Sequence, residues 1–272
     1  TTDKAGNGSA VIRFLPAPPP ETIPFASFYR HAFNGPGGWY IDLSRTSLGD
    51  NDPLGEYNSR LWATNNEAMR KQVSSQARRQ TYVSNIYVVQ DRANPENEGK
   101  VFLFKYGKKI FEKVHAAIEP KFAEDTPFDP FHPIDGANFK LRQKKQAGYP
   151  NYDDSQFESC VPMLRGDEAA ILSALNSLKS LTALVQPDKF KSYEELQKKL
   201  NKVMGFDTTR FLSPSAAEVS TGAVESSYEA PMPAMRTVEA TPWIPPTAEG
   251  TGVDDESGSE DSDLLSRFDT DD

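Results

Sequence analysis

The stretch VFLFKYGKK, residues 101–109, alternates along its first six residues and then turns basic at a glycine. Alternate side chains of a β-strand share a face, so Phe102, Phe104 and Tyr106 are expected to lie together. Either face of this strand could be the core, and for Phe102 a core position is expected. Tyr106 and the lysines after Gly107 then mark the point where the strand leaves the sheet, with cations around a ring.

Five further β-rich runs lie between turn signals in the first half of the chain. They cover residues 10–15, 25–33, 38–43, 81–90 and 137–146. Five or six short strands with one interleaved helix predict a small, partly open antiparallel barrel. The fold is therefore expected to be mainly β with helices.

Three helices are expected around this barrel. One follows Gly107, and a second covers residues 167–185, where apolar residues recur at spacings of three and four. The third covers residues 192–205, which open with Ser192 and Glu195 as a capping box and stop at a glycine. The last two helices are expected to flank the barrel.

The composition divides the chain into three regions. Residues 1–205 form the expected core, with a polar, irregular lobe inserted at about 44–76. Residues 206–253 are rich in Pro, Ser, Thr and Ala without periodicity, which is typical of a flexible linker. Residues 254–272 hold nine acidic residues against one arginine, a net −8 of the chain's −9. Such a run is typical of a solvated interaction tail, and three apolar residues within it favour a docking motif: Leu264, Leu265 and Phe268.

Rings and cations recur together at three strand ends, in ARRQTY (77–82), KYGKK (105–109) and KLRQKKQAGYPNY (140–152). A groove for single-stranded nucleic acid needs cations along the phosphates and rings that stack on bases, at ~1–3 kcal/mol per base. The three patches therefore predict such a groove, with little sequence preference. Its candidate residues are Arg78, Arg79, Tyr82, Lys105, Tyr106, Lys144, Tyr149 and Tyr152.

Enzyme classes find no support in the sequence. The three histidines form no ligand-spaced cluster, and phosphate-cradling loops and nucleophile elbows are missing. The single cysteine, Cys160, is expected to be a buried packing residue rather than a reactive thiol. No apolar run approaches the length of a membrane span, so no membrane partner is expected.

Several strings resemble the T-even-type bacteriophage helix-destabilising single-stranded DNA-binding protein family. They include AGNGSAVIRFLP (5–16), GWYID (38–42), NPENEGKVF (94–102), GYPNYDDSQF (148–157) and DKFKSYEEL (188–196). The resemblance covers most of residues 4–205, and the chain ends in the same kind of acidic tail as the family. It implies an OB-fold core that binds single-stranded DNA in phage replication, recombination and repair. It also adds Arg13 and Phe104 to the aromatic and basic lining of the cleft.

The family's zinc site, one His and three Cys, is not matched here. His31 fits the His position, whereas Ser44, Leu54 and Tyr57 stand at the Cys positions. Hydroxyls and a leucine cannot replace thiolates around Zn²⁺. No zinc or other cofactor is therefore expected, and the lobe must be held by packing, with Leu54, Leu61 and Trp62 as candidates.

The resemblance further implies that the acidic tail recruits phage replication and recombination proteins in the cytoplasm of the infected host. The family's basic N-terminal arm, which supports self-association along DNA, has no counterpart in the sequence given, so weaker cooperativity is expected. Two alternatives remain open from the sequence. One is a protein-interaction adaptor whose basic patches are ordinary solvated faces, and the other is a single-stranded RNA binder.

Overall fold

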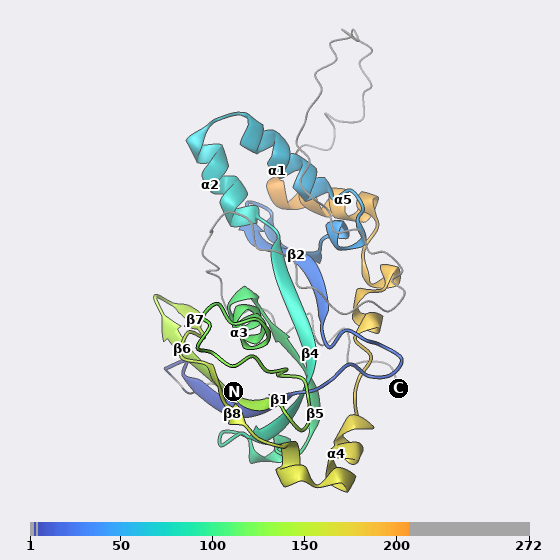
Figure 1. The fold of residues 1–272 in the computed structure, drawn as a ribbon. Helices are drawn as coiled ribbons and strands as arrows, with labels where there is room; N and C mark the ends of the chain where they lie inside the picture. Colours follow the sequence, from blue (N-terminus) through green and yellow to red (C-terminus); the bar gives the residue numbers. More distant parts are fainter. Residues whose placement is uncertain (1–2, 4, 207–272) are drawn as a thin grey trace, which may run out of the picture. The chain divides into compact units, whose positions relative to one another are not determined.

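The computed structural model describes residue 3 and residues 5–206, so the predicted tail and nearly all of the predicted linker lie outside the described residues. Antiparallel strands and α-helices make up this part of the chain (Figure 1). The strands are β1 (Gly8–Phe14), β2 (Ala26–Gly35), β3 (Gly38–Leu43), β4 (Arg79–Gln90), β5 (Val101–Tyr106), β6 (Ala137–Gln146), β7 (Tyr149–Asn151) and β8 (Gln156–Cys160). The α-helices are α1 (Pro53–Ala63), α2 (Glu67–Gln76), α3 (Lys108–Ile118), α4 (Glu168–Leu175) and α5 (Tyr193–Met204).

The described chain forms two compact units. Unit 1 holds the described residues up to Phe28 and Gln80–Lys189, and unit 2 holds Tyr29–Arg79 and the described residues from Phe190 onward. Strands β2 and β4 each run through the division between them. Within residues 3 and 5–206, no helix is both long and apolar enough to cross a membrane.

Unit 1 is built around β1, which pairs with β4 on one side and β6 on the other. Strand β5 pairs with β4, while β7 and β8 pair with β6. Phe14 of β1 is fully buried, and the rings of Tyr106, Phe131 and Phe139 each lie 5.7 Å from it, edge to face. Edge-to-face contacts are favourable because the positive edge of one ring meets the negative face of another. Helix α3 closes this core with Ile110 and Val114.

A second cluster of unit 1 lies beneath α4. Leu15, which follows β1 directly, is fully buried against Met163, Ile171 and Ala174. Leu172 is on the other side of the same helix and is 60% exposed. The alternation of buried and exposed positions identifies the side of α4 that faces the core.

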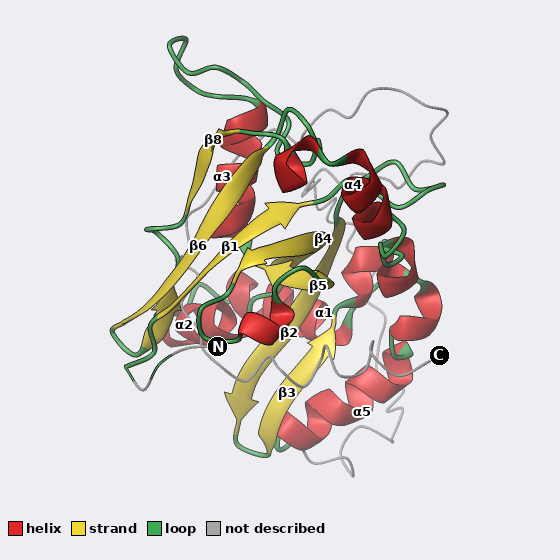
Figure 2. Cartoon of the chain, turned by 90° about the horizontal axis from the view of Figure 1, so that it is seen from below, coloured by secondary structure: helices red, strands yellow, loops and turns green. Residues whose placement is uncertain are grey.

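Unit 2 is a hairpin of β2 and β3 with α1, α2 and α5. Helix α5 lies beside β3 (Figure 2). It buries Leu196, Leu200 and Val203 in a core that includes Phe33 and Tyr40. The turn between the strands approaches the end of α5 very closely. The backbone N–H of Gly37 donates to the carbonyl of Val203 at 2.7 Å, and a side chain at Gly37 would clash with the carbonyl of Lys202. Glycine is therefore required at this position.

The predicted strands are confirmed, and β7 and β8 are additional. The helix after Gly107 and the capping box at Ser192 and Glu195 are also confirmed, the latter with both reciprocal hydrogen bonds. This mainly antiparallel architecture agrees with the expected small barrel.

Two predictions about helices are wrong. The apolar stripe of 167–185 is not one helix, because α4 ends at Leu175. Beyond it, the carboxylate of Glu21 accepts hydrogen bonds from the backbone N–H groups of Leu181 and Thr182 and stabilises a separate short turn. The lobe at 44–76 is not irregular: Asp52 and Asn66 cap the N-termini of α1 and α2 with their side chains.

Three expected side-chain positions are also wrong. Phe102 is 36% exposed, whereas Tyr106 at the other end of the same strand is buried in the core. Cys160 is exposed at the end of β8. In the lobe Leu54 is fully buried as expected, but Trp62 is 52% exposed, with the guanidinium of Arg70 over its ring.

The contrast between Leu15 and Leu172 gives a direct test of the unit 1 core. We expect Leu15→Ala to lower the free energy of unfolding by about 2–5 kcal/mol, because it removes buried methyl groups and leaves a cavity. Leu172→Ala, the same substitution on the exposed side of α4, is expected to stay within about 0.5 kcal/mol of the parent. Urea denaturation followed by circular dichroism measures both. Equal effects of the two substitutions would contradict the assignment of the buried side.

Candidate nucleic-acid interface

Four rings form a continuous stack in unit 1, which we call the aromatic stack: Phe111, Tyr82, Tyr106 and Phe104. Tyr82 and Phe111 lie face to face, with ring centroids 3.9 Å apart and planes within 5°. Tyr82 of β4 is directly opposite Tyr106 of β5 in the strand register, which sets their stacking. The stack therefore joins β4, β5 and α3.

Burial separates the members of the aromatic stack by role. Tyr82 and Tyr106 are 5% and 4% exposed, so both rings are core residues in this structure. The hydroxyl of Tyr106 lies 2.9 Å from that of Ser84, and burial raises the pKa of Tyr106 well above its usual value. Phe104 at the end of the stack is only half-buried. It is the member that offers ring surface toward solvent.

Arg13, a predicted contact residue, is completely buried. Its guanidinium donates to the backbone carbonyls of Val161, His132 and Pro133 at 3.0, 2.9 and 3.3 Å. Burial lowers the pKa of Arg13, as expected for a cation removed from water. In this structure Arg13 ties β1 to two loops, and its side chain does not reach the surface.

The hairpin of β6 and β7 presents predicted site residues at the surface. Its tip turns at Ala147 and Gly148, which have φ of 51° and 91°. Next to the tip, Tyr149 is 38% exposed, and Lys144 lies 2.9 Å from the carboxylate of Asp154. Tyr152 is half-buried and donates its hydroxyl to Gln143 at 3.0 Å.

Asp153 connects this hairpin with α3. Its carboxylate lies 3.3 Å from Nζ of Lys109, and its backbone carbonyl accepts from Nζ of Lys113 at 2.9 Å. Hydrogen bonds from Asn151 and Lys109 hold the pKa of Asp153 below its usual value, so it stays ionised. The structure thus brings the KYGKK patch and the 140–152 patch together. Sequence reasoning missed Lys113, although its spacing of four from Lys109 on a predicted helix places both on one side.

The third predicted patch lies at the start of β4. Arg78 is exposed, with its guanidinium 4.4 Å from the ring centroid of Tyr29, another residue of unit 2. Arg79 is half-buried and opens the strand that carries Tyr82 three residues later. Lys105 on β5 is half-buried and lies opposite Val83.

The positions of the family's zinc ligands do not fit a metal ion. Leu54 is fully buried and offers no donor atom, and Tyr57 packs its ring against Phe206. The hydroxyl of Ser44 donates to Asp52 at 3.0 Å. In the described part of the chain, no group of three His, Cys, Asp or Glu side chains could hold a metal. The absence of zinc stays a prediction, which the donor chemistry of these positions favours.

A hydrogen-bonded cluster occupies this part of unit 2 instead. His31 is 2% exposed, with Nδ1 3.0 Å from the carbonyl of Gln76 and Nε2 3.4 Å from Asp52. The Asp52 carboxylate also accepts from the backbone N–H of Gly55 at 3.0 Å and so caps α1. Burial alone would raise the pKa of Asp52, but the facing His31 ring and hydrogen bonds from Gly55 and Ser44 hold it below its usual value.

The sequence is similar to those of known DNA-binding proteins. A family model described as "gp32 DNA binding protein like" matches residues 6–204. The single-stranded DNA-binding protein of Enterobacteria phage T4 is 43% identical over 211 residues, 75% of this chain and 68% of the phage protein. The protein of the same name from Enterobacteria phage T2 is 42% identical over 211 residues, with the same coverage. These relatives are named as binding proteins, which confirms the expectation that the chain is not an enzyme.

The cluster around Asp52 can be tested against the metal-centred alternative. We expect Asp52→Ala to lower the free energy of unfolding by at least about 2 kcal/mol, since it removes a helix cap and leaves buried donors without an acceptor. Asp50→Ala, which removes an exposed partner of Arg45, is expected to cost about 1 kcal/mol or less. Thermal unfolding with and without a chelator completes the test. A melting temperature that falls on chelation would contradict the metal-free assignment.

Proposed function

The chain belongs to the family of gp32-like DNA-binding proteins, and from this we propose that it binds single-stranded DNA without sequence preference through the surface formed by α3 and the β6–β7 hairpin. The observation that carries the proposal is the gathering of cations where α3 meets the β6–β7 hairpin, whose tip carries an exposed ring. Lys109 and Lys113 contact Asp153, Lys144 contacts the neighbouring Asp154, and Tyr149 beside the tip is 38% exposed. We infer that the supporting sheet of unit 1 is an OB-fold, the scaffold that commonly carries such surfaces.

Two kinds of contact would hold the strand. Lysine and arginine side chains bind phosphates, and that part of the affinity falls as salt rises. Tyr149, Tyr152 and Phe104 stack on bases, a contact that tolerates any base. Arg13, Tyr82 and Tyr106 act beneath this surface, because their burial makes them supports of the sheet and of the aromatic stack.

Binding of this kind destabilises duplex DNA passively. A ligand that binds only the unpaired strand shifts the melting equilibrium toward it by mass action. The proposed setting is the cytoplasm of a phage-infected bacterium, where the protein would protect single strands in replication, recombination and repair. The acidic tail with Leu264, Leu265 and Phe268 lies outside the described residues, and recruitment of replication and recombination proteins by it is part of this proposal.

A fluorescence titration with a poly-pyrimidine strand and a matched duplex tests the central claim, with the chain's own Trp and Tyr residues as probes. We expect quenching by the single strand alone, weakening as salt rises. An equal response to both nucleic acids, or none, would favour the adaptor alternative. A parallel titration with the RNA of the same sequence separates the RNA alternative.

The stacking contribution is tested at Tyr149. We expect Tyr149→Ala to weaken single-strand binding by ~1–3 kcal/mol, since it removes one exposed ring face. Tyr149→Phe keeps the ring and is expected to retain the affinity of the parent. Equal losses in the two variants would show that the hydroxyl, not the stacked ring, makes the contact.

The tail gives a separate prediction. Residues 254–272 carry a net charge of −8 and are joined to the core by the predicted linker, so they are expected to compete with DNA for the cations of the proposed binding surface. Deletion of 254–272 is therefore expected to tighten single-strand binding, most strongly at low salt. Equal affinities of the full and shortened chains at low salt would refute the competition.

A further inference from the structure

The outward side of the unit 1 sheet carries a second group of cations, away from the aromatic stack. In the strand register Ser9 of β1 lies opposite Arg142, and Val11 lies opposite Lys140 on one side and Gln90 on the other. The neighbours in sequence, Ile12 and Phe139, are buried in the core. Because side chains alternate along a strand, Lys140 and Arg142 therefore point away from the core.

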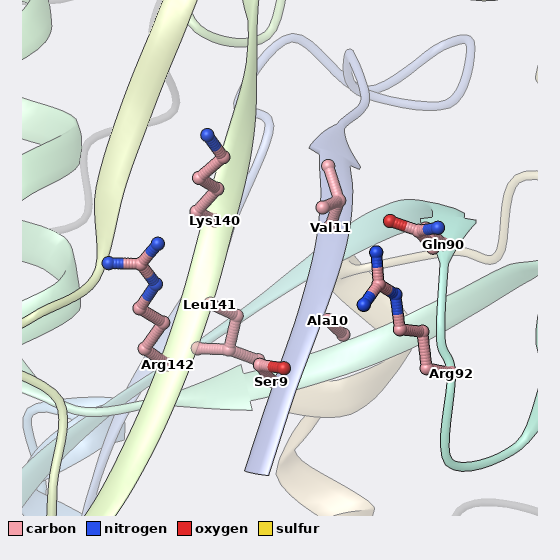
Figure 3. Close-up of a pocket in the computed structure, with 8 residues that line it drawn as sticks. All are labelled: Ser9, Ala10, Val11, Gln90, Arg92, Lys140, Leu141 and Arg142. Carbon is pink, nitrogen blue, oxygen red and sulfur yellow. The ribbon is translucent and has the colours of Figure 1, made fainter.

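These residues surround a hollow of about 140 Å³ (Figure 3). Ser9, Ala10 and Val11 of β1 line it between the longer side chains of the neighbouring strands. Lys140 and Arg142 border it from β6, and Arg92 borders it beyond the end of β4. The complete lining is Ser9, Ala10, Val11, Gln90, Arg92, Lys140, Leu141 and Arg142, without a single acidic residue.

The charges of the hollow are only partly compensated by the protein. Lys140 is paired with Glu158 of β8 at 2.8 Å. Arg92 and Arg142 are exposed, and neither has an ion pair within the part of the chain that the structure describes. Two guanidinium groups beside one hollow match an oxyanion, since each can donate two parallel N–H bonds to it.

The same side of β6 leads from the hollow to the proposed DNA-binding surface. Lys140, Arg142 and Lys144 alternate along the strand, about 7 Å apart. At the end of this row Tyr149 lies opposite Gln146, two residues beyond Lys144 and therefore on the same side. A basic row thus runs from the hollow to an exposed ring.

We infer that the hollow binds a backbone phosphodiester of the strand whose bases stack at Tyr149. This inference rests on the proposed function and extends it, because it gives the strand a path along the outward side of β6. Arg92 and Arg142 supply the phosphate contact, and Ser9 and Gln90 add neutral donors at the border.

The test compares the full chain with its variant Arg92→Gln/Arg142→Gln. Each lost phosphate contact removes about 0.7 from the slope of log affinity against log salt for single strands. With a long oligothymidylate we therefore expect a slope about 1.4 smaller, so that the variant's loss of affinity is about 7-fold greater at 50 mM than at 200 mM salt. Lys121→Gln/Lys198→Gln removes two exposed charges elsewhere and is expected to keep the parent's slope.

The outcomes separate this inference from the proposed function. If the arginine variant keeps the parent's slope of log affinity against log salt while the parent binds single strands, the phosphate path is overturned and the proposed function stands. A parent chain that binds no single strand overturns both. A titration with inorganic phosphate, followed by NMR at the arginine Nε–H groups, is the second arm. If the NMR shifts of these groups saturate at millimolar phosphate, and the arginine variant keeps the parent's salt dependence of DNA affinity, the hollow binds a free anion and the inference is overturned.

Discussion

The stacking of Tyr82 on Phe111 is the contact on which the proposed surface depends. It fixes α3 against β4, and the opposite face of Tyr82 continues the stack to Tyr106 of β5. With α3 held in this way, Lys109 and Lys113 reach Asp153 beside the hairpin. In the proposed binding mode the buried rings contribute by placing cations, a different role from the direct stacking that their residue type suggests.

The strands were predictable because their signal is local. Alternation in 101–106 and in 137–146 defines two faces whatever the rest of the chain does, and the capping box at Ser192 satisfies its own helix end. The choice of face is not local. Phe102 and Tyr106 are equivalent by alternation, and only the packing of α3 and Phe14 decides that Tyr106 is buried.

The residue types of the candidate surface could be predicted from the sequence, but their positions in space could not. The association of rings and lysines in 105–109 and 140–152 is visible in the sequence, and the structure joins these patches. The burial of Arg13 depends on three carbonyl groups more than a hundred residues away, which no pattern near Arg13 could show. The short turn that follows α4 likewise depends on Glu21, a residue about 160 positions earlier in the chain.

Unit 2 shows how a fold can keep a buried polar centre without soft metal ligands. A carboxylate that caps a helix, accepts from a serine and faces a histidine satisfies several donors at once. Such a centre is directional, because each hydrogen bond requires its own geometry, and it therefore specifies one arrangement of α1 against the hairpin of β2 and β3.

The acidic partners of the surface lysines have a consequence for the thermodynamics of the proposed binding. Asp153, Asp154 and Glu158 act as tethered counter-ions for Lys109, Lys144 and Lys140. A phosphate that takes their place releases a carboxylate which stays attached to the protein, whereas a cation without such a partner exchanges freely dissolved ions. The entropy gained per contact is then smaller at the tethered lysines. The surface is in effect pre-neutralised, and it favours ligands that offer a dense row of strong anions over those that offer a single charge.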